Sequence, residues 1–160
     1  MLEVIVRKGL PMQTLNWLQD YWLTSDQKIE NRTYETQNEN YEGMTFTISG
    51  ETFRSRLAKK TPKKKGYFVV FWEKDPQNKN QPYAFLEAPN QLIVIVKDAE
   101  KQGCFLFPKE VLLQQGILSS DTSKGKMALR VYPIWETDLN ASAARTQKWQ
   151  TKYFSDYTNK

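Results

Sequence analysis

The residues best suited to a chemical task are basic, and they gather in one short segment. Residues 52–66 read TFRSRLAKKTPKKKG, with seven bases and no acid. The 160-residue chain carries 23 Lys and Arg against 18 Asp and Glu, so outside this segment acids outnumber the 16 remaining bases. Such a local stripe attracts polyanions, because each neutralised phosphate releases condensed counterions. An ordinary solvated loop is the alternative interpretation. The seven bases are Arg54, Arg56, Lys59, Lys60, Lys63, Lys64 and Lys65.

A second basic cluster follows a small polar loop, SSDTSKGK at residues 119–126. Lys124, Lys126 and Arg130 lie in and just after this loop, with no acid between Asp121 and Arg130. A loop that contains glycine can offer backbone N–H groups to phosphate, but a lone Gly-Lys pair lacks the rest of a P-loop. The cluster therefore favours phosphate binding and gives no support to a nucleotide hydrolase.

The residue types that are missing exclude most familiar enzyme mechanisms. The chain has no histidine and one cysteine, Cys104, which removes Ser-His-Asp and Cys-His nucleophile systems and zinc sites built from those side chains. Cys104 stands among apolar residues and is predicted to be a small buried hydrophobe. Carboxylate, lysine or hydroxyl chemistry remains, as does a binding protein without chemistry.

The basic segment is predicted to lie on a β-hairpin. Residues 44–48 and 53–57 alternate between apolar and polar side chains, with a Ser-Gly turn between them. Because side chains alternate across a strand, we expect Arg54 and Arg56 to stand together on the face opposite the core. Pro62 then ends the strand, since proline donates no ladder hydrogen bond.

The remaining pattern predicts the elements that would support this hairpin. We expect helices over residues 13–23, after Pro108 as far as Gly116, and from an N-cap at Asn140. The segment Thr24 to Asn40 is polar and unpatterned, and is predicted to be a long connection. Further strands are predicted over residues 67–72, 92–96, 104–107 and 128–133. The whole chain, residues 1–160, is therefore predicted to be one α+β domain, whose central mixed or antiparallel sheet of five or six strands is flanked by helices.

Four ordered stretches of this chain resemble the MepB family. They are AKKTPKKKGYFVVFW (58–72), GCFLFPKEVLLQQGILS (103–119), GKMALRVYPIW (125–135) and RTQKWQTKYF (145–154). The resemblance implies a small bacterial cytoplasmic protein, found mostly in Gram-positive bacteria, with a fold similar to type II restriction endonucleases and hence nucleic-acid binding. The motifs carry over Arg56, Lys59, Thr61, Pro62, Lys63, Gly66, Lys109, Gly125, Lys126, Arg130, Tyr132, Arg145, Gln147, Trp149 and Gln150.

Helix 141–157 offers two interpretations of its tryptophan. Trp149, flanked by Gln147 and Gln150, could stack on a base with amide readers beside it, and Arg145 would lie one turn away. A core tryptophan on an amphipathic helix is the alternative.

A nuclease of the restriction-endonuclease type needs an acid near a strand start and a (D/E)-x-K run on the neighbouring strand to hold Mg²⁺. No predicted strand carries that run. The best available set is Glu87 with Lys109, and Asn90 stands where the family leads us to expect an acid. We therefore assign no catalytic residue, metal or cofactor, and keep a metal-dependent nuclease as the alternative.

These observations together predict a protein that grips the phosphate backbone of nucleic acid, DNA rather than RNA. A non-catalytic accessory module linked to drug response is the other alternative. The longest apolar runs are far shorter than the roughly 20 residues that span a bilayer. The N-terminal residues lack a signal-peptide pattern, so a cytoplasmic location is expected. The sequence leaves the oligomeric state open.

Overall fold

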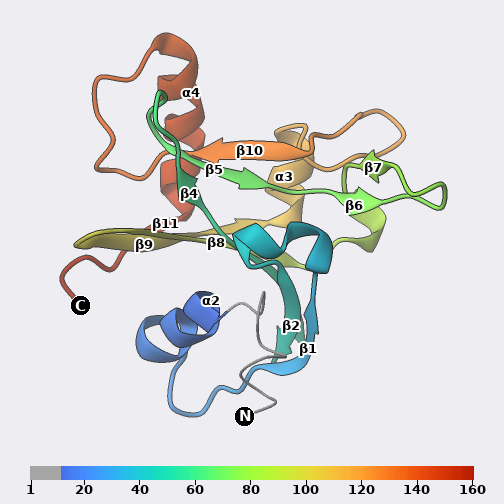
Figure 1. The fold of residues 1–160 in the computed structure, drawn as a ribbon, viewed down its shortest axis with the longest axis horizontal. Helices are drawn as coiled ribbons and strands as arrows, with labels where there is room; N and C mark the ends of the chain where they lie inside the picture. The colour runs from blue at the N-terminus through green and yellow to red at the C-terminus, as the bar shows by residue number, and fades with distance from the viewer. Residues whose placement is uncertain (1–11) are drawn as a thin grey trace.

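The computed structural model describes residues 12–160; the N-terminal stretch examined for a signal peptide lies outside them. The backbone forms a six-stranded main sheet in the order β1-β2-β3-β8-β9-β11, a three-stranded second sheet in the order β10-β5-β4, and a β6-β7 ribbon (Figure 1). The strands are β1 Glu30–Tyr34, β2 Met44–Ile48, β3 Glu51–Leu57, β4 Lys59–Lys60, β5 Tyr67–Val70, β6 Glu73–Lys74, β7 Asn80–Gln81, β8 Gln91–Asp98, β9 Lys101–Pro108, β10 Ala128–Val131 and β11 Phe154–Asp156.

Helices are short and cover different sides of the main sheet. Figure 1 shows α2 on one side of this sheet and α4 with the second sheet on the other. The helical segments are α2 Met12–Trp17, a π-helical turn η1 Leu18–Trp22, the 3₁₀ turns η2 Thr36–Tyr41, η3 Phe85–Glu87 and η4 Thr151–Tyr153, α3 Lys109–Gln114 and α4 Ala141–Gln150. None of the helices within residues 12–160 is long and apolar enough to cross a membrane.

The predicted hairpin is confirmed as β2 and β3. Ile48 pairs with Glu51 across a two-residue turn in which Ser49 has φ 50° and Gly50 has φ 83°. Positive φ at both positions matches the twist of a tight hairpin, and the second position suits glycine because it has no Cβ. β3 then pairs in parallel with β8, which makes the main sheet mixed.

β3 is the element that passes from one sheet to the other. The N–H of Ala58, just after β3, still donates to the carbonyl of Ile95 in the main sheet at 2.9 Å. The next two residues form β4, which pairs with β5 in the second sheet. The basic segment therefore begins inside the main sheet and ends on the second one.

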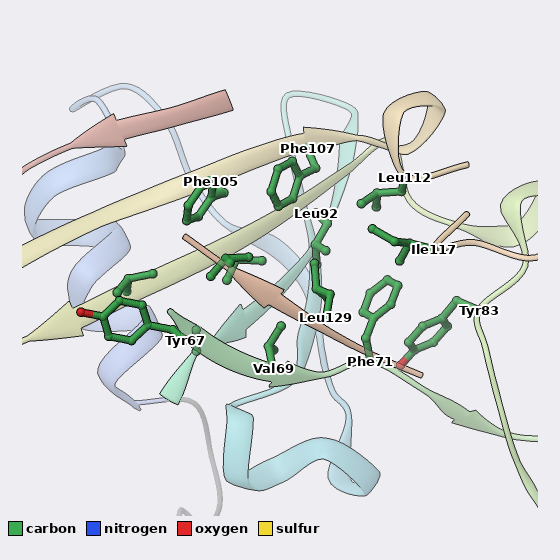
Figure 2. Close-up of a cluster of buried hydrophobic side chains, with 14 of the residues drawn as sticks. Tyr67, Val69, Phe71, Tyr83, Leu92, Phe105, Phe107, Leu112, Ile117 and Leu129 are labelled. Atoms are coloured by element: carbon green, nitrogen blue, oxygen red, sulfur yellow. The ribbon is translucent and has the colours of Figure 1, made fainter. Parts of the chain in front are cut away.

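Two hydrophobic clusters cover the two faces of the main sheet. Between the sheets, Val69 and Phe71 of the second sheet region pack in the same cluster as Leu92 and Phe105 of the main sheet (Figure 2). On the opposite face, the α2 and η1 segments bury Trp17 and other apolar side chains against β2, β3 and β8. Burial on both faces explains the unbroken apolar run in β8.

Other local predictions are confirmed at the helices. The side chain of Asn140 accepts a hydrogen bond from the N–H of Ala143 at 2.8 Å and so caps α4. Pro108 precedes α3, and Gly116 follows it with φ 74°.

Three predicted elements differ from the structure. The helix predicted over residues 141–157 ends as α4 at Gln150, and Phe154–Asp156 form strand β11, which pairs with β9. The segment Thr24 to Asn40 is not wholly a connection, because it contains β1 and most of η2. β1 is an edge strand whose first four side chains are exposed, so its backbone pairing with β2 leaves no apolar pattern to detect. The strand predicted at 67–72 is central, but in the second sheet: the side chains on its inner face are buried, and those on its outer face, Phe68 and Val70, are half-buried.

Burial makes the thiol of Cys104 unreactive in the native protein. Cys104 is 2% exposed, and burial raises its pKa to about 12. We expect iodoacetamide at about pH 8 to leave this thiol intact in the native protein and to alkylate it in guanidinium, because the thiolate is the nucleophile. Mass spectrometry after each treatment measures the difference. Alkylation of the native protein at the rate of a free thiol would contradict this burial.

Candidate nucleic-acid interface

Two adjoining cavities lie beside β10 and α4. The first has a volume of about 370 Å³ and the second of about 530 Å³. Lys64, Arg130 and Tyr132 line both cavities, so the two lie side by side. We call the two cavities together the basic groove.

The lysine loop, residues 61–66, is held against one side of the basic groove. The ammonium group of Lys65 donates to the carbonyls of Thr137 and Asp138 at 2.6 and 3.2 Å. The N–H of Gly66 donates to a carboxylate oxygen of Glu136. Gly66 has φ 80°, and a Cβ there would lie 2.6 Å from the ring of Tyr132. A glycine is therefore required where the loop turns beneath that ring.

Arg130 connects the lysine loop to the second sheet. It stands opposite Phe68 on β5, and its guanidinium carbon lies 5.5 Å from the centre of the Phe68 ring. The same guanidinium donates to the hydroxyl of Thr61 at 3.0 Å and to the carbonyl of Lys65 at 3.1 Å. Lys126 lines the first cavity from the polar loop before β10. The two basic clusters, which are far apart in the sequence, therefore lie along one groove.

The charge of the basic groove is predominantly positive. Lys63, Lys64 and Lys126 are exposed, and no carboxylate within residues 12–160 forms an ion pair with them. Asp138 is the carboxylate among the residues that line the second cavity. Unpaired ammonium groups around a hollow attract anions more strongly than the same groups would beside carboxylates.

The free edge of β10 is covered by a side chain of α4. The Gln150 amide accepts from the N–H of Tyr132 at 2.9 Å and donates to the carbonyl of Arg130 at 3.0 Å. Gln150 thereby takes the place of a neighbouring strand. Gln147, predicted as a base reader, donates to the carbonyls of Pro133 and Glu136. Both amide N–H groups of Gln147 are therefore engaged by backbone carbonyls in this structure, and its contact with a base stays a prediction.

The expectation that Arg54 and Arg56 stand on an open face is wrong. Arg56 is completely buried, and the side chain of Arg54 is 11% exposed. β3 lies inside the main sheet, and the face that carries both arginines is covered by η2 and by the chain around Val70 and Tyr83. Neither residue lines the basic groove.

Arg56 uses all five of its N–H donors. They reach the carbonyls of Val70 and Ser55, a carboxylate oxygen of Glu35 at 2.7 Å, the amide oxygen of Asn38 at 2.6 Å and the hydroxyl of Tyr83 at 2.9 Å. When every N–H of a buried guanidinium has an acceptor, these hydrogen bonds offset the free-energy cost of removing the charged group from water. This residue is therefore a structural tie rather than a phosphate contact.

Glu35 is the carboxylate that neutralises the buried arginines. Its burial would raise its pKa, but the charges of Arg56 and Arg54 and hydrogen bonds from Arg56 and Tyr83 together lower that pKa below its usual range. The guanidinium of Arg54 also lies 3.7 Å from the centre of the Tyr83 ring. No local pattern marked Glu35 in the sequence, because the partners of its carboxylate come from residues 54, 56 and 83.

The other predicted contacts are dispersed over the surface. Lys59 lies over the ring of Tyr41 at 5.1 Å, and Lys60 pairs with Asp98 at 3.3 Å. Lys124 and Arg145 are exposed outside the two cavities. Lys109 lies over the ring of Phe85 at 4.6 Å, in a different part of the fold.

The residues considered for a nuclease site have other partners. Asn90 accepts from the N–H and hydroxyl of Thr52, and its carbonyl accepts from the N–H of Lys109. Glu87 is exposed on η3. Within residues 12–160, no three His, Cys, Asp or Glu side chains are grouped so that they could hold a metal ion.

Trp149 packs on the core and also reaches the first cavity, and its stacking on a base stays a prediction. It is half-buried, and its ring lies 5.4 Å from that of Phe107 in the core. It also lines the first cavity. Phe68 and Thr146 line that cavity too, and sequence reasoning missed both. Alternation along residues 67–72 could have placed Phe68 on an outer face, but nothing local pairs it with Arg130.

The fold and groove together define an α+β protein with a mixed six-stranded sheet and a basic hollow beside a second, smaller sheet. A family model described as MepB-like matches residues 35–156. The chain belongs to the MepB-like family. A crystal structure of MepB is 46% identical in sequence, with a TM-score of 0.82, over 93% of this chain and 98% of that one. No curated protein matches the chain. The likeness to restriction endonucleases stays a prediction.

The buried arginine cluster yields a test of stability. We expect Glu35→Gln to lower the free energy of unfolding at neutral pH by about 3 kcal/mol, because it leaves two arginines without their carboxylate. A lowered pKa contributes stability above the ordinary carboxyl pKa, and that stability is lost as the pH falls through the folded-state pKa. The difference between wild type and variant should therefore shrink in acid. Urea unfolding across pH measures it.

The matched control is Glu39→Gln. Glu39 is exposed on the same 3₁₀ turn, so its loss should change stability by no more than about 0.5 kcal/mol at any pH. A Glu35→Gln variant as stable as this control would show that the ion pairs contribute nothing.

Proposed function

We propose that this is a cytoplasmic protein that binds the phosphate backbone of nucleic acid, DNA rather than RNA, in the basic groove. One observation carries the proposal: the lysine loop and the Lys126–Arg130 segment, which lie far apart in the sequence, line the same pair of adjoining cavities. Family membership agrees with the proposal but does not supply it.

The side chains of the groove suit phosphate in different ways. Lysine ammonium groups on Lys63, Lys64 and Lys126 act as mobile point charges that follow a backbone. The guanidinium of Arg130 is held in place by Thr61 and by the carbonyl of Lys65, which pre-orients its remaining donors. Such contacts hold the backbone and carry no base sequence information.

Salt dependence tests this proposal. If the four bases Lys63, Lys64, Lys126 and Arg130 each contact a phosphate, the logarithm of the affinity for duplex DNA should fall with the logarithm of salt concentration at a slope of about −3 to −4. Lys64→Ala and Lys126→Ala should each weaken binding and reduce the slope by about one. Fluorescence anisotropy at several salt concentrations measures both quantities.

Lys79→Ala is the control for general electrostatics. Lys79 is exposed on the β6-β7 turn and does not line either cavity. Lys79→Ala should therefore leave the affinity for duplex DNA and its salt slope unchanged. A flat slope, or an effect of Lys79→Ala equal to that of Lys64→Ala, would contradict a site in the groove.

A cleavage assay separates binding from hydrolysis. We expect no cleavage of plasmid, linear duplex or single strands in Mg²⁺ or Mn²⁺, because Asn90 supplies no charge beside Glu87 and a hard cation prefers carboxylates. Gel electrophoresis after incubation measures this. Cleavage that EDTA and Glu87→Gln both abolish would instead support the nuclease alternative.

A further inference from the structure

The first cavity of the basic groove differs from the second in its aromatic lining. Phe68 of β5, Tyr132 after β10 and Trp149 of α4 all line it. All three are half-buried. Three elements therefore bring aromatic side chains to one hollow of about 370 Å³ whose rim carries Lys64, Lys126 and Arg130.

Each aromatic ring is also held by packing against a residue that does not line the cavity. The ring of Tyr132 packs over Gly66, where an added Cβ would lie 2.6 Å from it. Trp149 packs against Phe107 with ring centres 5.4 Å apart. Phe68 meets Tyr41 edge-on at 6.2 Å. Rings fixed in this way offer apolar area to a ligand without a large loss of side-chain entropy on binding.

Polar groups of the cavity are available for the edge of a planar ligand. The hydroxyl of Thr146 donates to the carbonyl of Ser142 at 3.2 Å, and its lone pairs are still able to accept. Gln115 is exposed and lines the same cavity. Aromatic rings, polar side chains and basic side chains together match a ligand that has a flat aromatic ring, polar atoms at the edge of that ring, and an attached phosphate.

We propose that the first cavity receives an unpaired base of single-stranded nucleic acid, while the phosphates of the same strand follow its basic side chains, Lys126 included, into the second cavity. The inference rests on the proposed function, because it assigns bases to one end of a groove that holds phosphates at the other. Lys64, Arg130 and Tyr132 line both cavities, so a base and its neighbouring phosphate can occupy them together.

The proposal implies a preference for single strands. Stacking on an aromatic side chain stabilises a bound base and tolerates any base, because each base has a π-face. A base in a duplex must be unpaired and unstacked before it can enter a pocket, and this step weakens the binding of a duplex. The groove should therefore hold an unpaired strand more tightly than a duplex.

Three fluorescent probes of about 12 nucleotides separate base contacts from phosphate contacts. They are a mixed-sequence single strand, an abasic strand with the same number of phosphates, and a duplex, each titrated at one salt concentration. We expect wild type to bind the single strand about tenfold more tightly than the abasic strand, and more tightly than the duplex.

Tyr132→Leu and Tyr132→Phe are the matched variants. Tyr132→Leu should remove most of the difference between base-bearing and abasic strands, and Tyr132→Phe should keep it because the ring remains. Equal affinity of wild type for the first two probes, or a duplex bound as tightly as the single strand, would overturn the base pocket and leave phosphate binding standing. Absence of binding to all three would overturn the proposed function itself. The wild-type comparison decides the matter even if Tyr132→Leu does not fold.

Discussion

The buried guanidinium of Arg56 is the interaction on which the arrangement of the two sheets depends. It lies on β3 of the main sheet, yet it donates to the carbonyl of Val70 in the second sheet and to groups of η2 and of the loop at Tyr83. A buried charge that lost these acceptors would be strongly unfavourable, so every segment that supplies one is held in place. Glu35 completes the cluster by supplying the opposite charge.

The hydrogen bonds of Arg56 fix the second sheet on the main sheet, and this arrangement leaves the outer face of the second sheet partly open. The second sheet packs its inner face on the main sheet, and its outer face is left with Phe68 and Arg130 as cross-strand neighbours. The lysine loop joins β4 to β5 at the same place, and α4 closes the edge of β10 through Gln150. Rigid support beneath a partly open face is what a binding groove requires, because side chains whose positions are already set lose little entropy when a ligand arrives.

Local patterns in the sequence predicted several elements but not which segments they contact. The β2-β3 hairpin followed from alternation and a Ser-Gly turn, and the start of α4 followed from Asn140, because both signals act within a few residues. β1 was not predicted because an exposed edge strand is held by backbone pairing and shows no apolar face in the sequence. The sequence does not distinguish the roles of Gln147 and Gln150. In the structure the Gln147 amide bonds a backbone carbonyl of the turn after β10, and the Gln150 amide bonds backbone groups at the end of β10.

The sequence by itself determined the family, the α+β class and the clustering of bases in residues 52–66 and 124–130, because composition, periodicity and motifs are properties of contiguous residues. Only the tertiary structure decided which of those bases face solvent. Arg56 and Lys64 carry the same charge eight positions apart, yet one is buried among five acceptors and the other lines an open groove. The difference arises because burial of a strand face depends on which distant segment covers it, and no local pattern records that contact.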